Sequence, residues 1–202
     1  MSHGWPARLR EGRIELRPLR LRDATAWREV RTRNARWLRP WEATLPLAEQ
    51  DAPATYGAMV RRLRAEAREG RGLPFALIVD GSFAGQVTVG GIARGSLLSA
   101  YIGYWIDQRA AGRGNMPTAV AMATDHCFGE VGLHRVEINI RPENAASLRV
   151  VQKLGFREEG LRERYLHIDG AWRDHLTFAL CADDVPEGVL GRWLSSRVSP
   201  GA

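Results

Sequence analysis

Residues 101–128 have the composition and spacing of an anion-binding corner. Residues 101–106 are mostly aromatic and β-branched, which is typical of a buried strand. Gly112 and Gly114 follow, and apolar residues then recur at helical spacing. A chain that turns through glycines into a helix leaves backbone N–H groups unpaired at the positive end of the helix dipole. The stretch therefore predicts a phosphate or pyrophosphate site, with a simple tight turn as the alternative.

Two well-known phosphate loops do not match this corner. The sequence has no G-x-x-x-x-G-K-[ST], and G-x-G-x-x-G fails because the third glycine position is Pro117. What remains is R-x-x-G-x-G, formed by Arg109, Gly112 and Gly114. It resembles the acetyl-CoA pyrophosphate loop of the GCN5-related N-acetyltransferases, the GNAT family, whose pattern is Q/R-x-x-G-x-G/A. The resemblance implies that acetyl-CoA is bound here by Tyr104, Trp105, Ile106, Arg109, Ala111, Gly112, Arg113, Gly114, Asn115 and Met116.

A second motif follows the next expected strand. Asn144 and Ser147 begin a short run that closes with Lys153, Gly155 and Phe156. From the residues alone, Asn144 is a helix N-cap and its apolar neighbours are core. The pattern N-x-x-S…K-x-G-F also resembles the second cofactor element of GNAT enzymes. That resemblance implies an Asn144 hydrogen bond to the pantetheine arm and a Ser147 hydroxyl near the thioester sulfur.

The last expected hairpin adds a subfamily resemblance. Its sequence follows Y-x-x-x-[DN]-G-x-[WY]-x-D from Tyr165, which looks like the Rim-type acetyltransferases that modify the N-terminal amine of ribosomal proteins. Residues 38–41, Leu-Arg-Pro-Trp, are similar to the substrate-side loop of those enzymes. The structural alternatives are a two-residue hairpin turn at Asp169 and Gly170, and simple packing for Tyr165 and Trp172.

The resemblance implies direct transfer, in which a neutral amine attacks the thioester carbonyl and coenzyme A leaves as a thiolate. Backbone N–H groups of a bulged strand at residues 104–106 are expected to polarise the carbonyl. Ser147 is the candidate for stabilising or protonating the thiolate. An N-terminal amine has a pKa of about 8, so part of it is already neutral and a base has little to do.

Several residues compete for the role of general base. Glu42 lies in the substrate-side loop, and Glu163, Tyr165 and His167 share one face of an expected strand. Glu42 and Tyr165 are the catalytic candidates beside Ser147, and a water relay is the alternative.

The elements around these motifs predict an α/β fold with the element order of the GNAT fold. It has a mixed, mostly antiparallel twisted sheet with a central β-α-β crossover, flanked by helices. Residues 37–46 are expected to be non-helical because of two prolines, and Asp23 is expected to cap the first helix. The expected division is a lead-in at residues 1–13, a GNAT domain at 14–181 and a tail at 182–202 that contains one weak helical patch around Val189, Leu190 and Trp193. Expected strands lie at 14–19, 75–79, 85–92, 101–106, 134–140, 161–168 and 172–180, and helices at 23–36, 56–70, 117–128 and 144–154.

Composition limits the class of protein. The 202 residues, 45% of them hydrophobic, fit one domain, and a net charge of +6 favours an anionic ligand or an RNA-rich neighbourhood. Cys127 and Cys181 are expected to be buried thiols, and no metal site is expected. The sequence has no apolar signal core and no membrane span, so a cytoplasmic protein is expected. Direct nucleic-acid binding is not expected, and the chain is expected to be a monomer or a homodimer.

The function expected from these features is acetyl transfer from acetyl-CoA to a protein N-terminal amine, with ribosomal proteins as the leading substrates. One alternative is an acetyltransferase for a small amine, such as an antibiotic or polyamine. Such an enzyme usually needs an acidic pocket, which the arginine excess disfavours. The other alternative is a non-catalytic module that senses acyl-CoA or associates with RNA, although no RNP-type or helix-turn-helix motif supports RNA binding.

Overall fold

The computed structural model describes residues 4–46 and 55–198. The elements follow the expected order, with an additional strand at the start, the short helix α2 after the first helix and a well-formed helix in the tail. They are β1 (Leu9–Glu11), β2 (Ile14–Pro18), α1 (Ala24–Arg33), α2 (Ala35–Leu38), α3 (Tyr56–Arg68), β3 (Leu73–Val79), β4 (Ser82–Ala93), β5 (Ser99–Ile106), α4 (Asn115–Phe128), β6 (Arg135–Ile140), α5 (Ala145–Leu154), β7 (Arg157–Ile168), β8 (Ala171–Cys181) and α6 (Val189–Val198).

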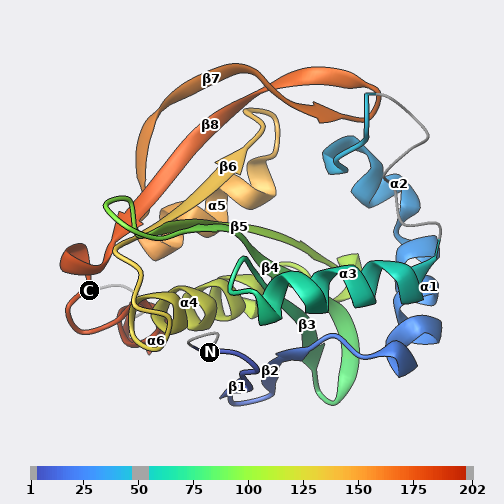
Figure 1. Ribbon diagram of the computed structural model, residues 1–202, viewed down its shortest axis with the longest axis horizontal. Coiled ribbons are helices and arrows are strands. Elements are labelled where there is room, and N and C mark those ends of the chain that lie inside the picture. The colour runs from blue at the N-terminus through green and yellow to red at the C-terminus, as the bar shows by residue number, and fades with distance from the viewer. Residues whose placement is uncertain (1–3, 47–54, 199–202) are drawn as a thin grey trace.

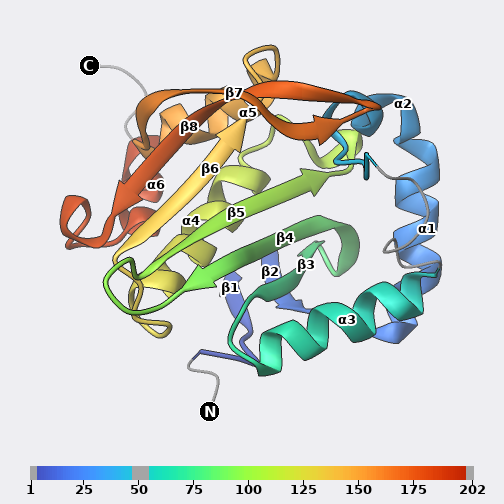
Figure 2. The same ribbon diagram turned by 45° about the horizontal axis from the view of Figure 1, so that its top comes forward.

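The strands form one sheet in the order β1-β2-β3-β4-β5-β6-β8-β7. Neighbouring strands run antiparallel except β5 and β6, which are parallel and joined through α4. This confirms the mixed, mostly antiparallel sheet with a central crossover. Figure 2 shows α4, α5 and α6 behind the sheet and α3 in front of it, with α1 at one end.

Apolar packing on both faces of the sheet holds these layers together. The larger cluster joins the sheet to α4, which is buried along almost its whole length, as its largely apolar sequence requires. The smaller cluster lies on the other face, where Val60 of α3 packs against Ala76 and Ile78 of β3. Cys127 lies in the larger cluster and Cys181 is half-buried, and both are free thiols. Within the described residues, no helix has both the length and the apolar character needed to cross a bilayer.

Strands β5 and β6 separate soon after they meet. Their pairing covers only Ser99 to Tyr101 of β5, although β5 continues to Ile106. The other edge of β5 pairs with β4 in unbroken register from Tyr101 to Ile106, so the expected bulge at residues 104–106 was wrong. The irregularity lies instead on β4, between Gly90 and Ala93. Separation from β6, rather than a bulge, therefore frees the backbone edge of β5.

Structured elements also lie outside residues 14–181. Strand β1 forms the sheet edge, and α6 buries Val189 and Trp193 in the larger cluster. The helix is longer and better packed than the weak helical patch expected in the tail, because its apolar stripe covers α4. Residues 1–3 of the lead-in and 199–202 of the tail lie outside the described residues. We propose that the folded unit extends from β1 through α6.

Two local expectations near α1 were wrong. Residues 37–46 include helical turns, because α2 reaches Leu38 and the 3₁₀ turn η2 (Arg39–Trp41) follows. Pro40 is tolerated there since the first residues of a helical turn need no N–H donor. Asp23 does not cap α1 through its side chain; it accepts hydrogen bonds from the backbone N–H of Arg20 and the guanidinium of Arg17.

Candidate functional site

A cleft of about 550 Å³ opens where β5 and β6 separate. Its walls come from the end of β5, the loop before α4, the start of α5 and the α1–α2 region. Figure 1 shows α5 and β5 beneath the arch of β7 and β8, with α1 and α2 at one side. The predicted site residues that line the cleft are Tyr104, Trp105, Ile106, Ala111, Gly112, Gly114, Met116, Asn144, Ser147 and Glu42. Those that do not line it are Arg109, Arg113, Asn115 and Tyr165.

The loop at residues 112–116, called here the glycine corner, has the geometry of an anion site. Gly112 and Gly114 have φ values of +76° and +81°, which other residues rarely adopt. Gly114 is the N-cap of α4, and its carbonyl accepts the first helical N–H, from Thr118, at 3.1 Å. Within the described residues, no acceptor is found for the backbone N–H groups of residues 112–116. Pro117 has no backbone N–H group. Several donors therefore converge at the positive end of α4, which suits a phosphate.

Three residues that were predicted to bind the cofactor do not line the cleft. Asn115 is 2% exposed, and its side chain accepts from Arg13 at 3.1 Å and donates to the carbonyl of Ala110 at 2.9 Å. The Asn115 side chain therefore stabilises the loop through these two hydrogen bonds, which leaves its backbone N–H as the group available to a ligand. Arg109 and Arg113 are exposed and lie outside the cleft lining.

A buried carboxylate ties this loop to the first helical hairpin. Asp107 accepts from the guanidinium of Arg33 at 2.6 Å, from the side-chain amide of Asn34 at 3.0 Å and from the N–H of Arg109 at 3.2 Å. The Asn34 side chain in turn accepts from the N–H of Gln108 at 3.0 Å. These bonds position the start of the glycine loop relative to α1.

Asn144 and Ser147 lie at the opposite wall of the cleft. The Asn144 side-chain oxygen accepts from the N–H of Ser147 at 3.1 Å, so Asn144 caps α5. Its amide nitrogen and the Ser147 hydroxyl have no protein partner in the described ranges. The Tyr104 hydroxyl donates to the Ser147 carbonyl at 3.5 Å, and burial raises the pKa of Tyr104, which keeps that hydroxyl protonated. Asn144 can therefore cap α5 through its side-chain oxygen and, at the same time, donate a hydrogen bond to a cofactor through its amide nitrogen.

Substitutions at Asn144 separate these two roles. Asn144→Ala is expected to lower the free energy of unfolding by about 1 kcal/mol and to weaken coenzyme A binding. Asn144→Asp preserves the cap but replaces the amide donor with a carboxylate, so it should retain stability and still lose affinity. Urea unfolding and calorimetric titration measure the two effects. Full affinity in Asn144→Asp would leave Asn144 with the capping role only.

The other end of the cleft is built from aromatic rings and one ion pair. Arg31 pairs with Glu42, and its guanidinium lies over the rings of Trp27 and Trp105, 5.5 and 5.3 Å from their centroids. Trp41 lies beneath the guanidinium of Arg141 at 5.5 Å. This end is therefore an aromatic chamber with a carboxylate held at its wall by a fixed cation.

The segment after Trp41 meets the tip of the β7–β8 hairpin. Ala43 forms an antiparallel bridge with Ile168, and the N–H of Thr44 donates to the carbonyl of His167 at 2.9 Å. Arg39 pairs with Asp169 at 2.9 Å. The two segments that resemble Rim enzymes in sequence thus contact each other, and the first of them lines the cleft.

Tyr165 lies in the hairpin outside the cleft. Its ring packs edge-on against His175 at 5.8 Å and lies under the guanidinium of Arg162 at 4.8 Å. The expected common face of Glu163, Tyr165 and His167 is interrupted, because the register shifts between residues 162 and 166 and Arg164 has a φ of +47°. A catalytic role for Tyr165 stays a prediction.

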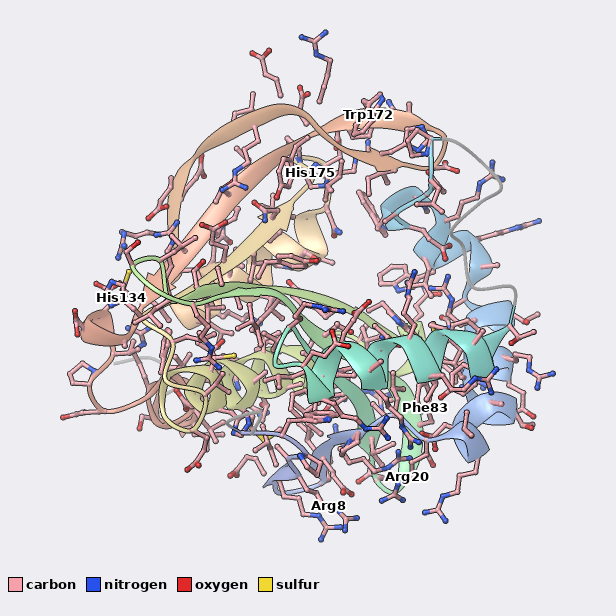
Figure 3. The ribbon with its side chains drawn as sticks, in the orientation of Figure 1. Arg8, Arg20, Phe83, His134, Trp172 and His175 are labelled. Carbon is pink, nitrogen blue, oxygen red and sulfur yellow. The ribbon has the colours of Figure 1, made fainter. Side chains whose placement is uncertain are left out.

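His175 lies beneath the β7–β8 arch, as Figure 3 shows. Burial lowers the pKa of His175, so its imidazole is neutral at pH 7. Within the described chain, no three His, Cys, Asp or Glu side chains gather into a possible metal site.

The comparisons with known proteins agree with this geometry. Residues 13–157 match the family model described as an acetyltransferase (GNAT) domain. The chain belongs to the GNAT family. This match confirms the family resemblance drawn from the sequence. The glycine corner at residues 112–116 lies within the matched residues, and its role as a pyrophosphate loop stays a prediction.

Several GNAT relatives carry Rim-type names. The structure of RimJ from Mycobacterium smegmatis in complex with CoA-disulfide superposes with a TM-score of 0.91, at 43% identity and 98% coverage of both chains. The ribosomal protein uS5 alanine N-acetyltransferase of Escherichia coli is 30% identical over 185 residues, which are 90% of this chain and 94% of that enzyme. The probable N-acetyltransferase YjcK of Bacillus subtilis is 39% identical over 105 residues, but the match spans only 58% of YjcK.

Sequence reasoning missed several cleft residues. Arg31 and Trp37 were interpreted only as parts of a helix and a proline-rich segment, although both line the cleft. Arg149 on α5 also lines it. Arg149 lies one helical turn after Ala145 and one turn before Lys153, so this spacing could have placed it on the same helix face.

Proposed function

We propose that this GNAT enzyme transfers the acetyl group of acetyl-CoA to the N-terminal amine of a ribosomal protein. The observation that carries the proposal is a continuous cleft that joins the glycine corner, the start of α5 and the aromatic chamber. One end suits a pyrophosphate and the other suits a peptide terminus. The names of the relatives, which include a uS5 alanine N-acetyltransferase and RimJ with CoA-disulfide, support this choice.

The proposed chemistry is direct acyl transfer. The lone pair of a neutral amine attacks the thioester carbonyl, the carbon–sulfur bond breaks, and the sulfur leaves as a thiolate that takes up a proton. Backbone N–H groups on the free edge of β5 would stabilise the oxyanion. Ser147, whose hydroxyl has no partner in the described chain, is the proposed donor toward the sulfur.

Glu42 is proposed to act on the amine. Its ion pair with Arg31 holds the carboxylate at the cleft wall. An ionised carboxylate there can accept a hydrogen bond from the incoming amine and receive its proton directly or through water. An N-terminal amine, with a pKa of about 8, needs only modest help to become neutral near pH 7.

The charges of the cleft favour a peptide over a polyamine. Arg31, Arg149 and Lys153 outnumber the two carboxylates that line the cleft, those of Glu42 and Glu143. A polycation would meet net repulsion here, whereas a peptide terminus brings one positive charge to Glu42.

Two linked measurements test the proposed function. We expect saturable calorimetric binding of acetyl-CoA, followed by acetylation of peptides that carry ribosomal-protein N-termini. Tandem mass spectrometry should place the new acetyl group on the α-amine, and peptides with blocked N-termini should stay unmodified. Acetylation of spermidine with no peptide modified would contradict the proposed substrate, and absence of acetyl-CoA binding would contradict the whole function.

A further inference from the structure

The C-terminal helix places a tryptophan against the first turn of α4. Trp193 is 6% exposed, and its indole Nε1 donates to the Thr118 hydroxyl at 2.8 Å. Thr118 is itself buried and binds the carbonyl of Gly114 through its hydroxyl at 3.0 Å. The indole ring is therefore fixed beside the glycine corner, and α6 lies next to α4 (Figure 1).

Two cations lie on this ring. The Lys153 ammonium is 5.8 Å and the Arg197 guanidinium is 5.5 Å from the ring centroid of Trp193. Among the described residues, neither cation is within ion-pair distance of a carboxylate. Lys153 lines the cleft, whereas Arg197 lies next to its glycine end. A buried aromatic ring thus orients two cations that lack a protein counter-ion.

Arg197 lies directly against the glycine corner. Its Nη1 atom is 3.1 Å from the position that a Cβ on Gly114 would occupy. The N–H groups of residues 112–116 already make this the positive end of α4. The Arg197 guanidinium and the positive end of α4 repel each other, which raises the electrostatic energy of the corner. A bound anion would lower that energy because it attracts both.

We propose that Arg197 binds a phosphate group of coenzyme A, and that Lys153 flanks the same ligand from the cleft side of Trp193. The inference rests on the proposed function. It concerns a helix beyond residue 157, where the match to the family model ends. Neither Arg109, the arginine of the R-x-x-G-x-G motif, nor Arg197 lines the cleft, but Arg197 lies against Gly114 and so supplies positive charge at the corner from another part of the chain.

The test compares coenzyme A with 3′-dephospho-coenzyme A by calorimetric titration. Arg197→Gln is expected to bind coenzyme A about tenfold more weakly at low salt, with a smaller difference at high salt. Arg197→Lys should recover much of the loss because it keeps the charge.

Arg68→Gln is the matched control, since it removes one exposed charge from α3, which lies on the opposite face of the sheet. In steady-state assays, Arg197→Gln should raise KM for acetyl-CoA and leave kcat unchanged.

The two ligands locate the contact. Equal losses for both ligands assign Arg197 to the pyrophosphate, and a loss for coenzyme A alone assigns it to the 3′-phosphate; either result supports the inference. Arg197→Gln affinities that match those of Arg68→Gln, with wild-type binding intact, would overturn the inference and leave the proposed function standing. Wild-type protein that binds neither ligand would overturn both.

Discussion

Gly112→Glu is expected to abolish coenzyme A binding, with an affinity loss of at least about 100-fold. Three causes act together. A carboxylate at the positive end of α4 repels the pyrophosphate, it can occupy the free N–H groups itself, and its bulk fills the approach to the loop. No heavy atom lies within 4 Å of a Cβ at this position, so the side chain fits without a clash in the folded protein.

The backbone cost of this substitution requires a matched control. Gly112 has a φ of +76°, so any side chain there costs about 1 kcal/mol of stability. In Gly112→Gln the side chain has the same length and causes the same backbone strain as Glu, but it carries no charge. The difference in coenzyme A affinity between the two variants therefore measures the repulsion between the carboxylate and the pyrophosphate. That difference should shrink as salt increases. A folded Gly112→Glu variant with wild-type affinity for coenzyme A would refute the assignment of the loop.

Asp107→Ala is expected to lower the free energy of unfolding by about 2 to 3 kcal/mol and to raise KM for acetyl-CoA. The substitution removes the acceptor for Arg33, Asn34 and the N–H of Arg109 at once. The loss falls below that of a fully buried pair because the Arg33 side chain is 36% exposed and can regain water. Asp107→Asn, which keeps the shape and one acceptor oxygen, should lose less stability.

The contribution of Asp107 should depend on pH in one direction. Burial alone would raise the pKa of Asp107, but hydrogen bonds from Arg33, Asn34 and the N–H of Arg109 hold it below its usual range. A carboxyl with a lowered folded-state pKa stabilises the protein fully above its unfolded value of about 3.9 and loses this effect as the pH falls toward the folded value. The stability gap between wild type and Asp107→Ala should therefore be constant near pH 7 and shrink below about pH 4. Urea unfolding over this range measures the gap, and a gap that widens in acid would contradict the assignment.

Local sequence signals predicted the parts of the site that depend on neighbouring residues. The glycine corner was predicted because Gly112 and Gly114 follow a β-branched run and precede a helical stripe, and each signal acts within a few residues. The cap by Asn144 was predicted for the same reason, and the structure confirms it.

Long-range contacts account for what the sequence did not predict. The bridge between Ala43 and Ile168 joins segments far apart in the chain, and no local preference encodes it. The irregularity near Arg164 has no glycine to mark it, so Tyr165 was assigned to a regular strand. The packing of Trp193 on Thr118 likewise depends on how α6 returns to α4.

The early separation of β5 from β6 has a consequence for inhibitor design. Tyr104 and Trp105 are adjacent on one strand, so their side chains point to opposite faces of the sheet, yet both line the cleft. The cleft therefore reaches both faces, and under the proposed function the two substrates would occupy it together. A bisubstrate compound that joins the sulfur of coenzyme A to a peptide N-terminus would engage both faces at once, and its tethered halves would bind more tightly than either half alone.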